Sequence, residues 1–255
     1  MEDTARIPTN LRTLLILEIL GKSDRALTAT EINESLGLPK QTIHRLCVTL
    51  ERTGFLSRHG NSRRYQAARR LRDLGSGLLH HSRLHIARRQ ILLSVAGQVR
   101  ETVNFVVPEA AGMSYLDRVE TDWAFQIQLP IGTNVPFHCT ASGKSFLASL
   151  APKPRRALVS SLQLEKLTEA THTDPDALLE DLDLIAKRGY SLDEQEFLEG
   201  MVAIAVPVTD PAGRFVAALA FHGPTQRLNV ESAIARREIL QDAALKLREA
   251  LFLGD

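Results

Sequence analysis

The stretch that decides the fold of the first part of the chain is Thr28–Arg52, TATEINESLGLPKQTIHRLCVTLER. It opens with Thr28 three residues before Glu31, which is the spacing of a capping box at the start of a helix. Gly37 predicts the end of that short helix, because a residue without Cβ readily takes the left-handed turn that follows a helix. Pro39 presets φ for the start of the next helix. The stretch therefore predicts two helices joined by a tight turn.

The second of these helices has one apolar and one polar face. Its apolar residues recur at i, i+3, i+4 and i+7, the period of one helix face: Ile43, Leu46, Cys47 and Leu50. The opposite face and the first turn carry hydrogen-bond donors: Lys40, Gln41, Thr42, His44, Arg45 and Arg52. Such donors read the edges of DNA bases, whereas a plain packing module would not need so many cations there. With the helix predicted over Leu11–Leu20 before it, the pattern indicates a helix-turn-helix.

Two strand-like runs follow this helix-turn-helix. Phe55–His59 and Arg63–Gln66 flank a turn signal at Gly60–Ser62, which predicts a two-stranded wing. Arginines on a wing would hold phosphates or enter a minor groove, so they would set orientation more than sequence preference. The residues predicted to contact DNA are Thr28, Lys40, Gln41, Thr42, His44, Arg45, Arg58, Arg63 and Arg64.

Charge is distributed unevenly along the chain. Residues 1–90 hold 16 Lys/Arg against 8 Asp/Glu, and residues 91–255 hold 15 against 22. The overall charge of +1 therefore conceals a basic first third on an acidic remainder. A basic surface can be merely solvated, but together with the helix-turn-helix it indicates that the first domain meets a polyanion.

Length and composition are those of a globular protein of two domains. The chain has 255 residues, of which 44% are hydrophobic and 24% charged. Its apolar runs are far shorter than a membrane span, and its start lacks the pattern of a signal peptide. The two cysteines, Cys47 and Cys139, are too few for a disulfide framework. We expect a cytoplasmic protein without cofactor, metal or membrane contact.

Residues 69–89 are predicted to form a linker helix between domain 1–68 and domain 90–255. Leucines recur there at helical spacing, and Gly75 and Gly77 weaken the helix. A linker helix that pairs with its copy in a second chain is expected. His81 and His85 are spaced i, i+4 and could hold a metal, but no third ligand is evident, so an exposed or interface role is favoured.

The pattern changes to alternating strands and helices beyond residue 90. Apolar runs bounded by Pro, Gly or Asp predict strands over Val103–Val107, Met113–Val119, Ala124–Leu129, Val202–Val208 and Val216–Phe221. Helices are predicted over Ile91–Arg100, Ser142–Ser149, Pro175–Arg188 and Val230–Leu251. This order favours an α+β domain with one mainly antiparallel sheet, whose last two strands form a hairpin.

The segment Pro136–Lys144, PFHCTASGK, leads into the predicted helix from residue 142. A loop of small residues at a helix start presents free N–H groups and the positive dipole end, which favours an anion such as a carboxylate. A nucleotide-binding loop is disfavoured, because the position of its leading glycine is taken by His138. Cys139 is interpreted as an inert buried residue.

A cluster of carboxylates, Asp193, Glu194, Glu196 and Glu199, follows further along. It is interpreted as a solvated loop or as one carboxylate turned into a pocket. An enzyme remains an alternative at this stage: a hydrolase using His138, Cys139 and Asp193. A second alternative is a constitutive DNA-binding protein whose large domain only oligomerises.

The order of these motifs resembles the IclR family of bacterial transcription regulators over nearly the whole chain. The residues that carry the resemblance are Gly37–Leu46, Gly54–Leu56, Tyr65, Leu71, Leu74-Gly75, Glu101–Asn104, Tyr115–Val119, Pro136–Lys144, Arg188–Tyr190, Asp193, Glu196, Gly200 and Ala205–Val208. The resemblance implies a winged helix-turn-helix and a GAF-like effector-binding domain. It also implies a homodimer or a dimer of dimers that binds operator DNA beside a catabolic operon, with RNA polymerase as a further candidate partner.

The resemblance further implies that a small acid is held by the Thr-Ala-x-Gly loop and by four side chains. Those four positions correspond to Asp193, Ala203, Ala220 and His222. Relatives often have Cys and two Ser where this chain has two alanines and a histidine. The loss of those hydrogen bonds predicts a larger, more apolar ligand, an aromatic or medium-sized organic acid. The residues predicted to bind the effector are Phe125, His138, Ala141, Ser142, Gly143, Asp193, Ala203, Ala220 and His222. Trp123 and Phe125 could supply an apolar wall, with ordinary core packing as the alternative for both.

Overall fold

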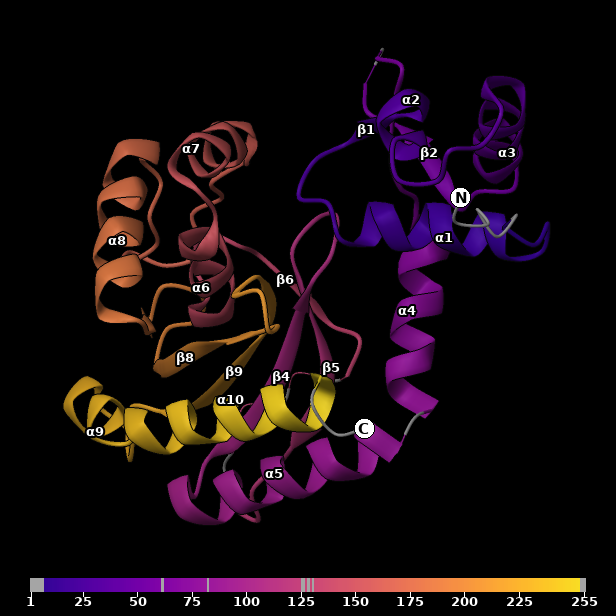
Figure 1. Cartoon of the computed structure of the whole chain (residues 1–255). Helices are drawn as coiled ribbons and strands as arrows, with labels where there is room; N and C mark the ends of the chain where they lie inside the picture. Colours follow the sequence, from indigo (N-terminus) through magenta and orange to yellow (C-terminus); the bar gives the residue numbers. More distant parts are fainter. Residues whose placement is uncertain are drawn as a thin grey trace. The chain divides into compact units, whose positions relative to one another are not determined.

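The computed structural model describes residues 7–60, 62–81, 83–124, 127, 129 and 131–252. The chain divides into two compact units, Met1–Ser82 and Arg83–Asp255, each of which is described by itself (Figure 1). Among the described residues, no helix is long and apolar enough to cross a membrane. Nor does the described part of the chain bring three or more His, Cys, Asp or Glu side chains together as a metal site.

The first unit is a winged helix-turn-helix. Its helices are α1 (Leu11–Gly21), α2 (Ala29–Asn33), α3 (Lys40–Arg52) and α4 (Arg69–His81), and its described strands are β1 (Leu27–Thr28), β2 (Leu56–Arg58) and β3 (Arg64–Ala67). These three strands form an antiparallel sheet in the order β1-β3-β2, in which β2 and β3 are the wing. The prediction of helix-turn-helix and wing is confirmed; β1 was not predicted, since two residues leave no pattern.

Local signals account for the helix boundaries of this unit. The Thr28 side chain accepts the Glu31 N–H, and the Glu31 carboxylate accepts the Thr28 N–H at 2.7 Å, so the predicted capping box is present. Gly37 has φ +59, as the turn after α2 requires. Ile43, Cys47 and other apolar residues of α1, α2, α3 and the sheet form one buried core: Ile16, Leu20, Leu27, Ala29, Ile32, Ile43, Cys47, Leu50, Leu56 and Tyr65.

The second unit is built on a sheet whose described strands are all antiparallel. The strands are β4 (Thr102–Pro108), β5 (Met113–Val119), β6 (Asn134–Val135), β7 (Ser191–Glu194), β8 (Met201–Thr209) and β9 (Phe215–Pro224). Their order is β6-β5-β4-β9-β8-β7, and β8 and β9 form the predicted hairpin. The helices are α5 (Arg83–Val99), α6 (Ala141–Ser149), α7 (Pro152–Ser161), α8 (Pro175–Arg188), α9 (Val230–Ala235) and α10 (Arg237–Phe252). The α+β expectation is confirmed.

Alternation along the strands gives the sheet two buried faces. Phe105, Ile204 and Phe221 point to the face that α5 and α10 cover, where the larger of the two cores lies. Val106, Ala205 and Ala220 point to the opposite face, which α6 and α8 cover (Figure 1). The second face carries alanines at positions where the first carries large residues.

Several boundaries differ from the prediction. The linker expected over residues 69–89 is two elements: α4 ends at His81 in the first unit, and α5 begins at Arg83 and continues through the helix predicted over Ile91–Arg100. The helix expected over Val230–Leu251 is divided into α9 and α10 at Arg236, whose φ of -95 and ψ of 4 depart from helical geometry. Of the strand predicted over Ala124–Leu129, the described residues 124, 127 and 129 are not in a strand.

Candidate functional site

Helix α3 presents an exposed row of polar side chains. Gln41, His44, Arg45 and Arg52 are exposed, as is Lys40 in the first turn, whereas Thr42 is half-buried. Among the described residues, none forms a hydrogen bond or ion pair with the side chain of Gln41, His44 or Arg45; Thr49 donates only to the Arg45 backbone carbonyl. Val48 lies in the same row and is 51% exposed. An apolar side chain in this position can contact a thymine methyl group, so Val48 is a further candidate for a base contact, which the pattern of donors alone does not indicate.

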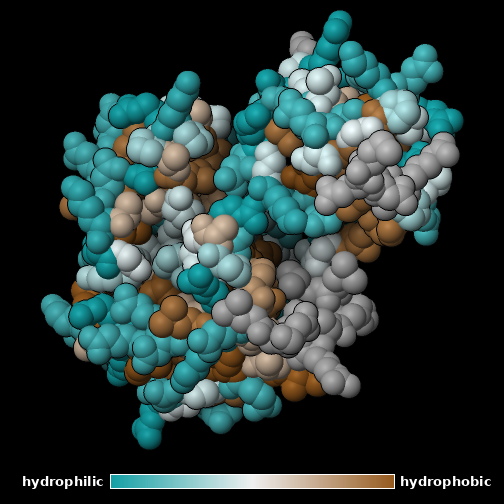
Figure 2. Space-filling view, in the orientation of Figure 1, coloured by the Kyte–Doolittle hydropathy of each residue, from teal (hydrophilic) through white to brown (hydrophobic). Residues whose placement is uncertain are grey.

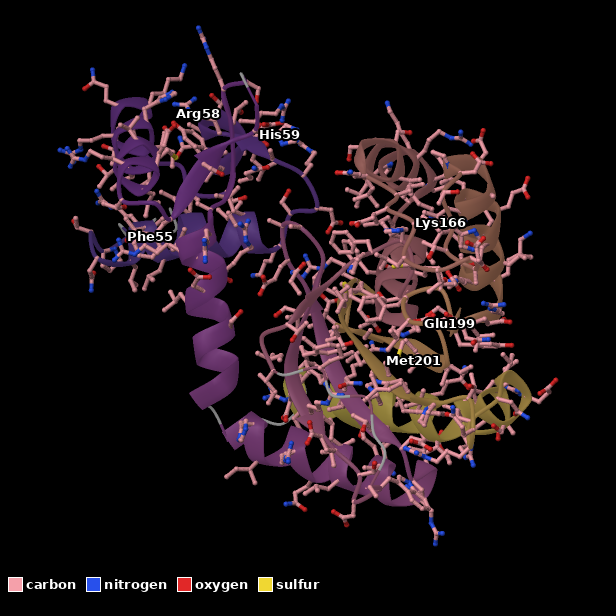
Figure 3. All side chains as sticks on the ribbon, turned by 180° about the vertical axis from the view of Figure 1, so that it is seen from behind. Phe55, Arg58, His59, Lys166, Glu199 and Met201 are labelled. Atoms are coloured by element: carbon pink, nitrogen blue, oxygen red, sulfur yellow. The ribbon has the colours of Figure 1, made fainter. Side chains whose placement is uncertain are left out.

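The wing arginines differ from one another. Arg58 donates to Glu51 at 3.0 Å and to the Tyr65 hydroxyl at 2.8 Å, and its guanidinium lies over the Tyr65 ring. These contacts hold the wing against α3; Arg58 is labelled in Figure 3. Arg63 is exposed at the wing turn. Of the predicted phosphate contacts on the wing, Arg63 is the one whose side chain has no partner in the described part of the chain.

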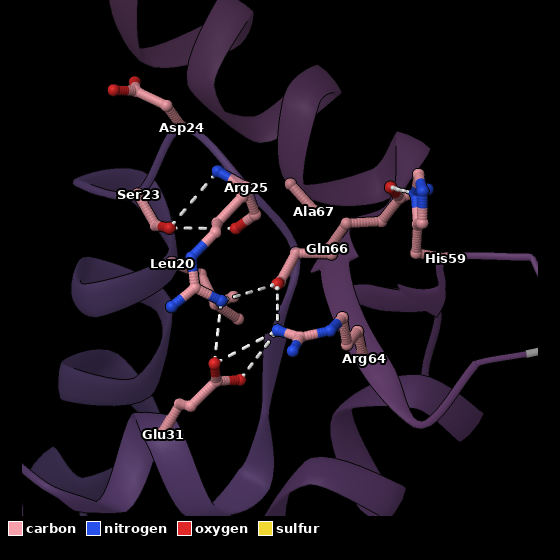
Figure 4. A pocket seen from close by; sticks show the side chains of 10 residues that line it. Leu20, Ser23, Asp24, Arg25, Glu31, His59, Arg64, Gln66 and Ala67 are labelled. Carbon is pink, nitrogen blue, oxygen red and sulfur yellow. Dashed lines mark hydrogen bonds and ion pairs between the residues drawn. The ribbon is translucent and has the colours of Figure 1, made fainter.

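Arg64 is ion-paired within the first unit, and its side chain is 42% exposed. Its Nη1 donates to the Glu31 carboxylate at 2.9 Å and to the Ala26 carbonyl at 3.1 Å, and Arg25 donates to the same carboxylate at 2.8 Å (Figure 4). Hydrogen bonds from the Thr28 backbone and from Arg25 lower the pKa of Glu31 to about 2. Thr28, also predicted to contact DNA, caps α2 in this cluster. Arg64 and Thr28 therefore position the wing and α2.

The second unit holds a small cavity between the sheet and the amino end of α6. Its volume is about 20 Å³, room for about one water molecule. Strands β4, β5, β8 and β9, helix α6 and the chain around β7 contribute its lining: Asn104, Tyr115, Thr140, Ala141, Ser142, Asp193, Phe197, Met201, Ala203, Ala220, Phe221 and His222. Met201, at the start of β8, is labelled in Figure 3. Asp193, Ala203, Ala220 and His222, far apart in the sequence, are brought together here.

Strand register explains why these four residues meet. Asp193 pairs with Ala203, and Ala203 pairs with His222, so three adjacent strands place them in one row across the sheet. Ala220 precedes His222 by two residues and points to the same face. The small side chains leave the space above the sheet to Asp193 at one end and His222 at the other.

Asp193 is completely buried with half of its carboxyl group unpaired. Its Oδ1 accepts the N–H groups of Glu196 at 2.8 Å and Phe197 at 3.2 Å, and its Oδ2 has no partner among the described residues. Burial, followed by the nearby charge of Glu196, raises the pKa of Asp193 to about 8. At neutral pH this carboxyl group is therefore mostly protonated and can donate a hydrogen bond.

Helix α6 begins beside Asp193. Its N-cap Thr140 accepts the Gly143 N–H at 3.1 Å, and no described residue accepts the N–H groups of Ala141 and Ser142. Gly143, which is predicted to contact the effector, also meets a packing requirement. A Cβ on it would lie 2.4 Å from the Phe137 carbonyl oxygen, so the glycine permits close packing of α6 on the preceding loop.

Lys144 forms a buried ion pair with one carboxylate of the cluster around β7, that of Glu196. Its Nζ donates to Asp181 on α8 at 2.8 Å and to Glu196 at 2.5 Å, and its side chain is 3% exposed. Because the Glu196 N–H donates to Asp193, this buried ion pair fixes the segment that carries Asp193. The interpretation of one carboxylate turned into a pocket agrees with this geometry, and the solvated-loop interpretation of Asp193 and Glu196 is wrong.

His222 is buried and uncharged in the pocket. Burial, with the charge of Arg118, lowers its pKa to about 4. Nη2 of Arg118 lies 3.2 Å from its Nε2, and the side-chain amide of Asn104 lies 3.0 Å from its Nδ1. Arginine can only donate, so Nε2 is assigned as the acceptor and Nδ1 as the carrier of the proton. The amide nitrogen of Asn104 is the atom placed beside Nδ1, and exchanging the oxygen and nitrogen of that amide gives its unpartnered oxygen the Nδ1 proton.

Other predicted contacts lie elsewhere. His138 is bonded through Nε2 to the Glu165 carbonyl at 3.0 Å and does not line the cavity. Trp123 is 47% exposed and donates to the Arg100 carbonyl, away from the cavity. Phe125 lies outside the described residues. The open space expected from the alanines is absent, because Phe197, Met201 and His222 occupy it.

Sequence reasoning missed Asn104, Tyr115 and Arg118. Each lies in a strand predicted from its apolar residues, and a polar side chain inside such a run was the available signal. Cys139 is completely buried, and burial raises the pKa of its thiol. Such a thiol is a poor nucleophile.

Two family models match the chain. The IclR helix-turn-helix domain matches residues 11–60, and the bacterial transcriptional regulator IclR C-terminal domain matches residues 77–249. The chain belongs to the IclR family. It is a DNA-binding transcription regulator with an effector-binding second domain, and it is not an enzyme.

Individual relatives of this IclR-family chain agree. The probable transcriptional regulator SauR of Cupriavidus necator is 38% identical over 87% of this chain and 88% of that protein. The transcriptional repressor IclR of Escherichia coli is 30% identical over 88% and 83%. The crystal structure of an IclR homolog complexed with 4-hydroxybenzoate, from Microbacterium hydrocarbonoxydans, has a TM-score of 0.60 and 28% identity over 95% of this chain and 98% of that one.

Proposed function

We propose that this chain controls a catabolic operon by binding an operator through α3 and the wing while a medium-sized organic acid, aromatic or aliphatic, occupies the pocket of the second unit. The observation that carries the ligand half is the unpaired Oδ2 of Asp193, completely buried beside the amino end of α6. A buried donor next to unpaired N–H groups suits a carboxylate.

The acid binds at a defined end of the pocket. Its carboxylate accepts the N–H groups of Ala141 and Ser142 and the proton of Asp193. Its body lies over Ala203 and Ala220, which offer apolar contact and no hydrogen bond. The 4-hydroxybenzoate complex of a structural relative supports an aromatic acid of this size. Because the cavity is about 20 Å³, binding requires the side chains around it to move.

The DNA half rests on the exposed row of α3. Gln41, His44 and Arg45 offer donors and acceptors to base edges in the major groove, with Val48 beside them. Arg63 holds the backbone phosphates. Arg58, Arg64 and Thr28 act indirectly, since they keep the wing and α2 in position for that contact.

A second copy of the chain is part of this proposal. Apart from half-buried Leu71, the side chains of α4 from Arg69 to Ser76 are exposed, including Leu74 at 49%. A helix of 13 residues is marginal in water without a partner. Pairing of α4 with its copy in a dimer, or in a dimer of dimers, would cover these leucines.

The experiment is a thermal-shift screen of aromatic and aliphatic acids on the full chain, followed by titration of operator DNA with and without the best acid. A ligand at 100 times its Kd stabilises the folded protein by about 2.7 kcal/mol, which such a screen detects. Ser142→Pro, which removes one N–H at the helix start, should weaken binding. If no acid shifts the melting temperature or the DNA affinity, the constitutive alternative replaces the proposal.

The DNA contacts are tested with an operator selected from a random pool. Arg45→Ala should weaken operator binding by about 1–3 kcal/mol and relax preference at one base pair. Binding of the same variant to unrelated duplex DNA should change much less. Equal losses on both DNAs would show that Arg45 contacts phosphate and that the recognition face is assigned wrongly.

A further inference from the structure

Arg118 is a buried cation at the edge of the proposed effector pocket. It lies near the end of β5, and its side chain is 2% exposed. It pairs with Asn104 on β4, which pairs with Ala220 on β9, so its side chain shares the face of the sheet that holds the pocket. Its guanidinium reaches Nε2 of His222, a residue that lines the cavity.

The partners of this guanidinium are almost all neutral. It donates to the backbone carbonyls of Ile127, at 3.0 Å, and Leu129, and to neutral His222. Its one described carboxylate neighbour is Glu120, at 3.5 Å from Nε and with a side chain 51% exposed. The charge of Arg118 thus lacks a buried counter-charge among the described residues.

The acidic residue that precedes Arg118 in the sequence, Asp117, is paired with other arginines. Asp117 points to the opposite face of the sheet, where Arg88 donates to it at 3.1 Å and Arg89 at 3.0 Å. Asp117 is 4% exposed and its carboxylate is fully engaged there and with the Arg118 backbone N–H. It therefore leaves the Arg118 guanidinium uncompensated.

Burying an arginine without an acid is unfavourable unless something else supplies the negative charge. A guanidinium is also the side chain best shaped to bind a carboxylate with two parallel hydrogen bonds. We infer that the effector carries two acidic groups: one at Asp193 and the amino end of α6, and a second at Arg118 and His222. This inference rests on the proposed function and adds the class of ligand to it.

Strand spacing sets the length of such a ligand. Asp193 and His222 lie on β7 and β9, with Ala203 of β8 between them in register. Two strand spacings are about 10 Å between Cα atoms, and the facing side chains take up roughly half of that. A diacid with four to six carbons, or a benzene dicarboxylate, spans the remaining distance.

The experiment compares acids that differ only in the second acidic group, using the full chain. Glutarate is paired with valerate, and isophthalate with benzoate, each titrated by calorimetry at constant ionic strength. We expect each diacid to bind at least about 10-fold more tightly than its monoacid partner, because the second carboxylate meets a charge already buried.

Variants of Arg118 identify the source of that preference. Arg118→Gln should reduce the diacid-to-monoacid ratio to about one, and Arg118→Lys should retain part of it, since a cation remains. Arg156→Gln, on an arginine whose side chain is 68% exposed, makes the same charge change and should leave the ratio unaltered. If Arg118→Gln does not fold, the diacid-to-monoacid affinity ratios of Arg118→Lys and of the unmodified chain still test the inference.

The outcomes separate the two proposals. If the monoacids bind as tightly as the diacids, or if Arg118→Lys and Arg118→Gln leave the preference intact, the inference of a second acidic group is wrong. The proposal that an organic acid is the effector is then unaffected. If neither class of acid binds and no other acid shifts the melting temperature, the proposed function itself fails.

Discussion

At the scale of single residues, Asp193 combines two features that seldom occur together: complete burial and an unpaired carboxyl oxygen. Burial raises its pKa from 3.8 to about 8. The folded protein therefore holds this proton between those pH values, whereas the unfolded chain releases it. The free energy of unfolding that Asp193 contributes is full below pH 3.8 and is lost as the pH rises toward 8.

We expect Asp193→Asn to be more stable than the unmodified protein at pH 9, by about 1 kcal/mol or more. An amide retains the oxygen that accepts the Glu196 and Phe197 N–H groups and carries no charge at any pH. The difference should shrink at pH 5, and urea unfolding at both pH values measures it. Asp242→Asn, an exposed site, is the control. A stability difference that does not vary with pH would contradict a buried, protonated Asp193.

The sequence predicted some of these residues and not others. Asp193 and His222 were carried over from the family resemblance, and strand register brings them together. His138 was predicted from its place before α6, but its ring turns to the Glu165 carbonyl. Arg118 was missed because a charged residue in a strand predicts exposure, and only tertiary packing shows that it is buried.

At the scale of elements, the capping box links the start of α2 to the wing, because its Glu31 also accepts a hydrogen bond from Arg64 of β3. Thr28→Ala should lower the free energy of unfolding by about 1 kcal/mol, because the Glu31 N–H loses its acceptor. Thr30→Ala, exposed in the same turn, is the matched control. Thermal unfolding of both variants measures the difference. Equal effects would mean that the cap contributes nothing beyond helix propensity.

Two glycines in helices should respond oppositely to the same substitution. Gly143→Ala places a methyl group against the Phe137 backbone and should destabilise the protein by about 1–3 kcal/mol. Gly97→Ala in α5 meets no atom within 4 Å and should stabilise it by about 0.5–1 kcal/mol. Denaturant titration measures the change in the free energy of unfolding for both variants. No change for Gly143→Ala would show that the loop before α6 moves aside at little cost.

Elements with strong local signals were predicted well. Helix α8 matches its predicted range because Asp174 caps it, Pro175 starts it and Gly189, with φ +76, ends it. Strand β7 was missed, since four residues with two acids resemble a loop, and its pairing with β8 is what makes it a strand. Helix α7 was missed because it has a polar composition.

At the scale of the whole molecule, the excess of basic residues lies in the first unit. Some of these residues, such as Arg64, form ion pairs with acids of the same unit instead of facing DNA. Arg63→Ala should flatten the plot of log affinity against log salt concentration by about one unit, because one phosphate contact is lost. Arg64→Ala should leave that slope unchanged and lower the melting temperature, since Arg64 is paired with Glu31. Titrations of duplex DNA across a salt series measure both. Similar slopes for the two variants would contradict this assignment.

The row Asp193–Ala203–His222 has a consequence for how such regulators diverge. Each position lies on a different strand, and side chains on this face take no part in strand pairing. A substitution in the row therefore changes one wall of the pocket and leaves the hydrogen-bonded ladder intact. Ligand preference can therefore change by single substitutions along this row without loss of strand pairing.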